Sequence, residues 1–274
     1  MNNSSYRQLF YSEINKSDAK IDLAKAALYF ALEDDRKFDP DEYLNALDTM
    51  ANEVQETLPE TLYPLQILKS INNYLYNDLG FTGNTTNYYD PRNSFLNQVI
   101  DRRIGIPITL SLIYLEIAKR INFPMVGIGM PGHFLIRPDF PEAGIYVDAF
   151  HQGEILFPQD CQARLAEIYG QPVELQPQFL ATVSNKQFLG RMLTNLKAIY
   201  LNQNKGLKAI TVIERILLLF PDAIMEKRDR GILYYQLNLW EEAREDLESY
   251  LVNLPQADDA EIIRQLLAKI NQNL

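Results

Sequence analysis

The residues best suited to chemistry are His133 and Asp148. Residues 133–137 and 145–149 are predicted as two short strands joined by the turn-rich segment 138–144. Pairing of these strands about the centre of the turn places His133 opposite Asp148. A carboxylate beside an imidazole orients the ring and raises its basicity, as in a hydrolytic triad. The pair predicts a catalytic dyad or, as the structural alternative, a histidine that secures the hairpin by a hydrogen bond.

The chain contains one cysteine and two histidines, which limits its other chemistry. Cys161 lies at the start of a predicted helix, and a free cysteine is usually buried and inert; the alternative is a reactive thiol. His151 follows the second strand and is interpreted as an exposed turn residue. These residues fall short of a Cys/His structural zinc site, so we predict no metal and no cofactor. A glycine-rich phosphate loop, an HExxH element and a GxSxG elbow are absent from the sequence.

A dense set of polar side chains precedes the predicted core helix, in the segments 88–94 and 101–103. Arginine is suited to bidentate contacts with carboxylates or phosphates, so ligand binding is one interpretation. The alternative is a polar network that fixes the junction between the helical region and the core. Tyr88 and Tyr89 either cover a groove near His133 or pack against other side chains. The candidate binding residues are Tyr89, Arg92, Asn93, Arg102 and Arg103.

The elements that must position these residues are predicted as helices first and a small sheet afterwards. Residues 22–33 follow a helical stripe, and Asp39-Pro40 is a start signal for a helix that runs toward Val54. Residues 65–79 form a third helix, which ends at Gly80.

The middle of the chain changes from helices to strands. A core helix is predicted from Pro107 to Arg120, and a short buried strand follows over residues 125–129. With the two strands of the hairpin, this order predicts an α+β core.

The last ninety residues contain an internal repeat. Three pairs of like residues recur 34 positions apart, which matches the period of the tetratricopeptide repeat; the alternative is chance alignment within helical hairpins. We predict two domains, residues 1–185 and 186–274, the second with two repeats and a capping helix. Its tyrosines are further candidates for partner binding. The repeated pairs are Tyr200 and Tyr234, Ala209 and Ala243, and Pro221 and Pro255.

The net charge of −10 argues against sequence-independent binding to nucleic acid and against an anionic membrane surface. The N-terminal residues MNNSSYRQLF lack the features of a signal peptide, and the longest apolar stretch, 104–118, is too short and too polar to span a bilayer. We therefore expect a cytoplasmic protein that contacts neither nucleic acid nor membrane. Its oligomeric state is left open.

The stretch from Tyr88 to Phe150 resembles the SirB-type family of transglutaminase-like proteins. Its residues read YYDPRNSFLNQVIDRRIGIPITLSLIYLEIAKRINFPMVGIGMPGHFLIR, and then YVDAF. The resemblance extends over nearly the whole chain. It implies an α+β protein with a mostly helical N-terminal region and a small papain/transglutaminase-like antiparallel sheet core, followed by an all-α array of tetratricopeptide helical hairpins.

The resemblance supplies a histidine and an acid but no nucleophile. His133 matches the histidine of the family's PGHF element, and Asp148 matches the acid of the next strand. Active relatives begin the core helix with a cysteine, whereas the corresponding position here is Ile108. A thiolate is nucleophilic, and isoleucine is not. Thr109 carries the nearest hydroxyl and is a candidate for a substitute nucleophile. The alternative is that its side chain packs in the core.

We therefore expect a non-catalytic transglutaminase-like protein that acts as a protein-binding or regulatory scaffold through its tetratricopeptide repeats. The acidic balance favours a basic protein or peptide partner. The alternative is a cysteine-protease-like or transglutaminase-like acyl transferase or hydrolase with an altered nucleophile. A third interpretation is a chaperone-like scaffold whose groove holds a peptide without cleaving it.

Overall fold

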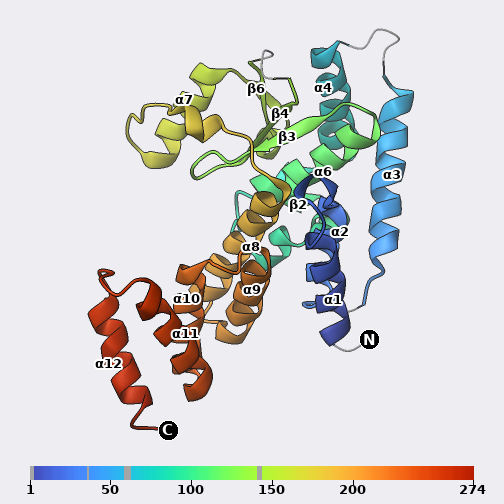
Figure 1. The fold of residues 1–274 in the computed structure, drawn as a ribbon. Coiled ribbons are helices and arrows are strands. Elements are labelled where there is room, and N and C mark those ends of the chain that lie inside the picture. The colour runs from blue at the N-terminus through green and yellow to red at the C-terminus, as the bar shows by residue number, and fades with distance from the viewer. Residues whose placement is uncertain (1–2, 36, 59–62, 141–143) are drawn as a thin grey trace. The chain divides into compact units, whose positions relative to one another are not determined.

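The computed structural model in Figure 1 describes residues 3–35, 37–58, 63–140 and 144–274. Contacts between Cα atoms divide the chain into two units, Met1–Met192 and Leu193–Leu274. The division lies inside helix α8 (Asn185–Asn202), whereas the sequence predicts a domain boundary at the start of this helix. None of the described helices combines the length and the apolar character that crossing a bilayer requires.

The first unit begins with helices whose starts are fixed by capping aspartates. Asp22 accepts a hydrogen bond of 3.0 Å from the backbone N–H of Lys25 at the start of α2 (Leu23–Ala31). Asp39 caps α3 (Pro40–Glu56) in the same way, with Pro40 in its first turn. The other helices of this region are α1 (Asn3–Ile14), α4 (Pro64–Asn72), its π-helical continuation η2 (Asn73–Asp78) and α5 (Leu96–Arg102).

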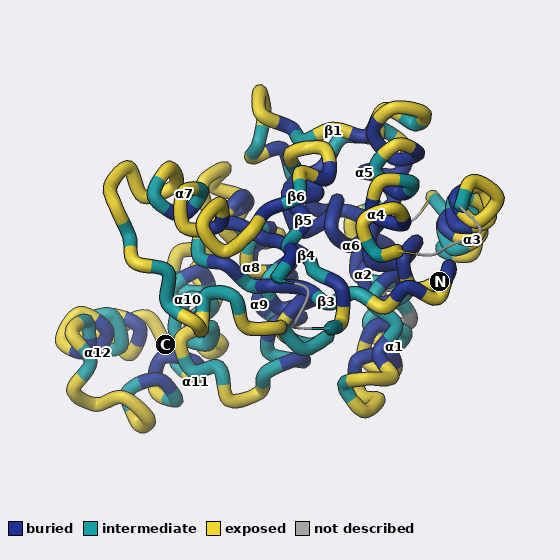
Figure 2. The backbone as a smooth tube through the Cα atoms, turned by 90° about the horizontal axis from the view of Figure 1, so that it is seen from above, coloured by how far each residue is buried: buried dark blue, intermediate teal, exposed yellow. Residues whose placement is uncertain are grey.

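Helix α6 (Pro107–Arg120) is the interior helix of the first unit. Every residue from Pro107 to Ala118 is buried. Figure 2 shows how this differs from α12 (Ala260–Ile270), which is largely exposed. A helix that is buried on all sides belongs to a core, so the predicted core helix is confirmed. A short parallel pair, β1 (Thr82–Gly83) and β2 (Ile104–Gly105), lies before it.

Four antiparallel strands form the sheet, in the order β3 (Met125–Ile128), β4 (Leu135–Pro138), β5 (Tyr146–Asp148) and β6 (Glu154–Leu156). The first three were predicted within two residues of their ends, and β6 was not predicted. Together with the surrounding helices, this sheet confirms the α+β class.

The predicted register of the hairpin is wrong by two residues. Ile136 pairs with Val147, so the backbone of Asp148 continues toward Leu135 rather than His133, and His133 lies before the strand begins. Side chains alternate between the two faces of a sheet, so a shift of two positions leaves each side chain on its predicted face.

Helix α7 (Pro158–Tyr169) packs against the sheet and places Cys161 and Leu165 in the core. Both side chains are fully buried. The other buried members of this cluster are Ile128, Met130, Leu135 and Leu156. Short 3-10 turns complete the unit: η1 (Asp18–Lys20), η3 (Pro91–Ser94), η5 (Ala149–His151) and η6 (Pro177–Leu180).

Helical hairpins make up the second unit. Ala209 and Ala243, which recur at the repeat period, are completely buried, and small residues allow paired helices to approach closely. Tyr200 is only 3% exposed, so it packs inside the unit instead of forming a binding surface, while Tyr234 is half-buried. After α8, the helices are α9 (Gly206–Leu219), α10 (Ile224–Gln236), α11 (Trp240–Asn253) and α12.

Candidate functional site

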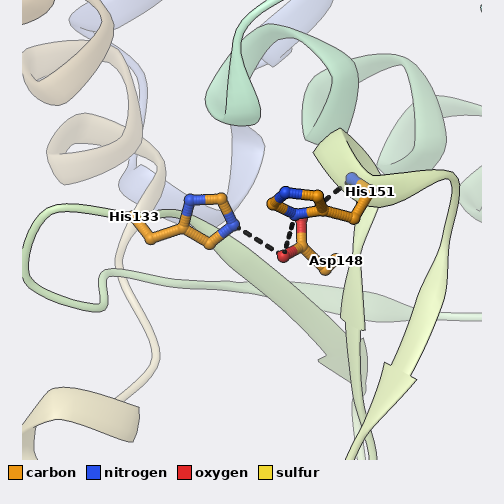
Figure 3. Close-up of side chains that lie close together, drawn as sticks. All are labelled: His133, Asp148 and His151. Atoms are coloured by element: carbon orange, nitrogen blue, oxygen red, sulfur yellow. Dashed lines mark hydrogen bonds and ion pairs between the residues drawn. The ribbon is translucent and has the colours of Figure 1, made fainter. Parts of the chain in front are cut away.

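His133, Asp148 and His151 form a cluster at one end of the sheet (Figure 3). Asp148 Oδ2 lies 2.8 Å from His133 Nε2 and 2.8 Å from His151 Nδ1. Asp148 is fully buried, His133 is 8% exposed and the side chain of His151 is 39% exposed. The predicted contact between His133 and Asp148 is therefore present, but a second imidazole shares the same carboxylate oxygen.

The turn that carries His133 is held from two sides. Gly132 adopts a left-handed backbone conformation with φ of +73°, and a Cβ there would lie 2.6 Å from Ile168. Arg191 of α8 donates hydrogen bonds from Nη2 to the carbonyl oxygens of Met130 (2.7 Å) and His133 (2.6 Å). These contacts fix the backbone from which the His133 ring reaches Asp148.

The carboxylate of Asp148 has two separate tasks. Its Oδ1 accepts hydrogen bonds from the backbone N–H groups of Phe150 (3.1 Å) and His151 (3.3 Å), which caps η5. Its Oδ2 faces both imidazoles. Burial alone raises the pKa of Asp148, but the hydrogen bonds and charges of His133 and His151 outweigh it and hold this pKa below its usual value.

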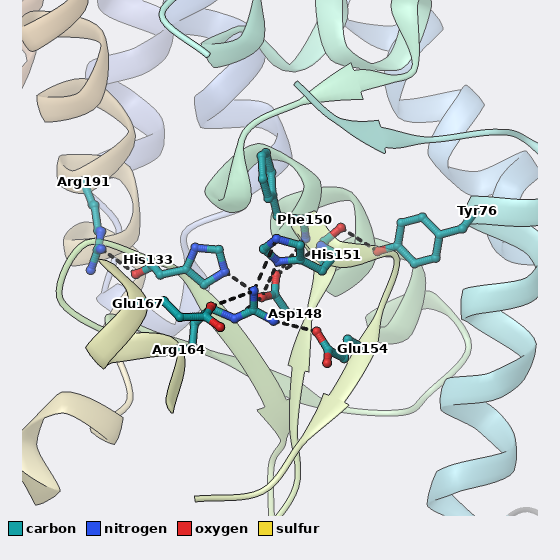
Figure 4. Close-up of polar contacts among 10 residues, drawn as sticks. Tyr76, His133, Asp148, Phe150, His151, Glu154, Arg164, Glu167 and Arg191 are labelled. Atoms are coloured by element: carbon teal, nitrogen blue, oxygen red, sulfur yellow. Dashed lines mark hydrogen bonds and ion pairs between the residues drawn. The ribbon is translucent and has the colours of Figure 1, made fainter. Parts of the chain in front are cut away.

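Arg164 of α7 extends the cluster (Figure 4). Its Nε is 3.8 Å from Asp148 Oδ2, and its Nη1 is 3.4 Å from His151 Nε2. The guanidinium also pairs with Glu154 at 2.6 Å and Glu167 at 3.6 Å. The cluster is thus a small charged network rather than an isolated dyad.

Aromatic rings line the other side of the imidazoles. The ring centroid of Phe150 lies 6.2 Å from that of His133 and 6.1 Å from that of Tyr88. Tyr89 packs edge-on against Tyr88 at 5.3 Å and is 61% exposed. Tyr76 donates a 3.0 Å hydrogen bond to the carbonyl of Ala149 and so holds the turn η5 in place.

The position that the family resemblance predicts for a nucleophile is apolar and closed. Ile108 is 1% exposed and Thr109 is fully buried. The Thr109 hydroxyl donates to the carbonyl of Asn93 at 2.8 Å and accepts from the backbone N–H of Ile106 at 3.1 Å. It therefore caps the start of α6, which is a structural use of the group proposed as a substitute nucleophile.

The single cysteine is also unsuited to attack. Cys161 is fully buried in the cluster beneath the sheet. Burial, together with the nearby charges of Asp160 and Asp148, raises the pKa of its thiol to about 12. The thiolate is the nucleophilic form, so almost none of the reactive species exists at neutral pH.

The polar segments before α6 form an internal network. Asn93 donates from Nδ2 to the carbonyls of Asn87 (2.9 Å) and Tyr88 (3.1 Å), and its Oδ1 accepts from Arg102 at 3.3 Å. Arg92 pairs with Asp90 at 2.6 Å.

Arg103, the residue after α5, donates to the carbonyl of Leu79 at 2.6 Å. The bonds of Asn93 to Arg102 and to Thr109 connect the segment 87–93 to α5 and α6. They favour the structural interpretation of these residues over ligand binding.

His151 is the cluster residue whose role the sequence analysis missed. It lies in a turn, as expected, but its ring points back to Asp148 instead of into solvent. The only signal available was its spacing, since residues three apart in one turn share a face.

The second unit contains a pocket of about 510 Å³ at the ends of α8 and α10. It combines leucine side chains with one lysine and one aspartate. Its lining residues are Leu201, Asn204, Lys205, Gly206, Asp229, Ile232, Leu233, Gln236 and Leu237. A concave surface of this kind is where helical repeats commonly hold other chains.

Comparisons with known proteins agree with the two-part organisation. A family profile described as the transglutaminase-like superfamily matches residues 41–194, and one described as a tetratricopeptide repeat matches residues 196–268. A UPF0162 protein of Xylella fastidiosa (strain 9a5c) is 34% identical over 271 residues, which cover 96% of this chain and 95% of that protein.

Other relatives share less of the chain. A UPF0162 protein of Vibrio cholerae is 34% identical over 190 residues, with 69% of this chain and 70% of that protein covered. Human F-box only protein 21 is 33% identical over 190 residues, which span 65% of this chain but 29% of that protein. No solved structure matches the chain significantly.

Proposed function

The chain belongs to the transglutaminase-like superfamily, with tetratricopeptide repeats behind that domain, and from this premise we propose that it is a non-catalytic member that acts as a protein-binding scaffold. The observation that carries the proposal is the residue at the start of α6. A thiol there would lie at a helix N-terminus, a position that favours the thiolate. Ile108 is buried at this position and offers no nucleophile.

The rest of the site supports the same interpretation. The hydroxyl of Thr109 is occupied by a cap, and the thiol of Cys161 is buried with a raised pKa. His133 contacts the carboxylate of Asp148, but the same carboxylate also contacts His151 and caps η5. A structural use of these residues accounts for each contact without a reaction.

Binding is assigned to the pocket between α8 and α10, which offers apolar contact area and two charged groups. The chain's net charge of −10 adds a long-range attraction for a basic peptide or protein, which we expect it to meet in the cytoplasm.

Affinity capture with the full chain and quantitative mass spectrometry tests the binding. The variant carries Leu201→Glu and Leu237→Glu, two pocket side chains that are 37% and 38% exposed, so the fold should tolerate both changes. We expect loss of captured partners by at least about tenfold, the scale of a lost binding hot spot. Val252→Glu is the control, because Val252 is 81% exposed on α11 and lies outside the pocket. Equal capture by all three proteins contradicts the proposal.

A second candidate is an acyl transferase or hydrolase with an altered nucleophile. The 2.8 Å contact between His133 and Asp148 favours it. It requires either that an acyl probe labels Thr109 or that Cys161 reacts rapidly with iodoacetamide at neutral pH, and that His133→Ala abolishes this reaction. Absence of label from Thr109, together with slow alkylation of Cys161 in the folded protein, rejects this candidate.

A further inference from the structure

We propose that His133, Asp148 and His151 bind a divalent transition-metal ion of the Zn²⁺ type. The sequence predicted no metal because two histidines and a cysteine do not make a structural zinc site. The structure brings together a different set, in which His133 Nε2, Asp148 Oδ2 and His151 Nδ1 all lie within 4.8 Å of one another. This site is independent of the pocket assigned to partner binding.

The donor set has the chemistry of a known class of site. Two imidazoles and one carboxylate bind Zn²⁺ in many proteins and leave a fourth position for water. The same set with open positions also suits Fe²⁺. Hard cations such as Mg²⁺ and Ca²⁺ prefer oxygen ligands and are disfavoured here.

The geometry requires all three donor-to-donor distances to become similar, including that between the two imidazole nitrogens, which lie within 4.8 Å of each other. In tetrahedral coordination with bonds of about 2.0–2.1 Å, neighbouring donor atoms lie about 3.3 Å apart. The two contacts of 2.8 Å must therefore open by about half an ångström. His151 has room to move because 39% of its side chain is exposed, and this same opening gives water and the ion a path to the site.

Coordination also requires a change of tautomer at both rings. Each nitrogen that faces Asp148 must offer a lone pair, so its proton moves to the other nitrogen of the same ring. No proton is released when both rings start neutral. The Nε2 of His151 then carries a proton and faces Arg164 Nη1, now 3.4 Å away, so the Arg164 side chain has to turn aside.

The charges around the cluster suit a dication despite the nearby arginine. Three carboxylates, those of Asp148, Glu154 and Glu167, surround the single guanidinium of Arg164. With neutral imidazoles, one positive and three negative groups give a formal charge of −2. An ion with charge +2 neutralises this group, and the glutamates hold Arg164 when it leaves Asp148.

Direct metal binding to the full chain, free of any histidine tag, tests the site. Zn²⁺ is titrated by calorimetry, and Co²⁺ is added as a spectroscopic probe whose visible absorption reports tetrahedral nitrogen and oxygen ligands. We expect one ion per chain with a dissociation constant below about 10 µM. Weaker binding than about 1 mM overturns the proposal.

Variants locate the binding. His151→Gln should weaken Zn²⁺ by at least about 100-fold, since even outer partners of metal ligands are worth about 10–100-fold. Arg164→Gln should instead tighten binding, because it removes the only cation of the network; a purely structural role for the cluster predicts no such gain. The charge-matched control is Lys269→Gln on the exposed side of α12, which also removes one positive charge and should leave the affinity unchanged.

Folding of each variant is checked by circular dichroism. His133→Gln should also weaken Zn²⁺ binding by at least about 100-fold. If this variant fails to fold, His151→Gln decides, because the side chain of His151 is the most exposed of the three. Zn²⁺ binding that survives in His151→Gln with wild-type affinity overturns the proposal.

Discussion

The hairpin end and the start of α6 differ in the chemical groups that they present. The end of the hairpin keeps an imidazole and a carboxylate in contact, whereas the start of α6 presents a buried isoleucine and a capping threonine. The polar side has a structural task, because Asp148 also caps η5 through its second oxygen. A dyad therefore does not by itself indicate catalysis: its residues can be required by the fold while the nucleophile is not.

The largest expected effect is a loss of stability when Asp148, at the end of the hairpin, is replaced. Asp148→Ala removes the acceptor of four hydrogen bonds and leaves two backbone N–H groups and two imidazoles without this partner. We expect a loss of about 3–5 kcal/mol in the free energy of unfolding, measured by urea denaturation.

Asp148→Asn is the matched variant, because its side-chain oxygen can still cap η5. It should lose less than half as much stability. If Asp148→Ala costs below about 1 kcal/mol, the fold does not require this carboxylate and the comparison fails.

The next effect tests the apolar side. Ile108→Ala opens a cavity at a side chain that is 1% exposed, and should cost about 2–4 kcal/mol in the same denaturation experiment. Ile108→Val removes one methylene and should cost about 0.5–1.5 kcal/mol. A cost near zero for both variants would mean that position 108 is an open cleft instead of a packed core.

A smaller loss of stability tests whether the Thr109 hydroxyl caps α6 or is free to act as a nucleophile. Thr109→Val keeps the shape but leaves the N–H of Ile106 without its side-chain acceptor, which should cost about 1–2 kcal/mol. Thr109→Ser retains the hydroxyl and should recover at least half of this loss. Equal stability of the two variants would show that the hydroxyl has no capping role.

The sequence predicted where helices begin and which residues share a face of the hairpin, but it did not predict the register of the hairpin. Asp22, Asp39 and Pro40 are local signals, and they place helix starts because capping depends on neighbouring residues. The hairpin register is set by the turn and by contacts across the sheet, and it was wrong by two residues. The contact between His133 and Asp148 was still found because a shift of two retains the face.

Contacts between distant segments account for what the sequence did not reveal. The turn after β5 leads into β6 through Gly153, whose carbonyl accepts a 2.7 Å hydrogen bond from Asn72 on α4. A Cβ at this glycine would lie 2.0 Å from the Asn72 side chain, so the close approach requires glycine. Nothing near Gly153 in the sequence indicates Asn72, and the orientation of His151 depends on the same turn.

The most direct test of the non-catalytic proposal is the reactivity of the only thiol. Cys161 in the folded protein is alkylated with iodoacetamide at several pH values and compared with the chain in urea, with the label located by mass spectrometry. A pKa of about 12, against 9.0 for an ordinary thiol, predicts a thiolate population at pH 7–8 that is about a thousandfold smaller than in the unfolded chain. The rate should rise about tenfold per pH unit and level off only near pH 12, and His133→Ala should leave it unchanged. Rapid alkylation of Cys161 at neutral pH that disappears in His133→Ala would contradict a non-catalytic site.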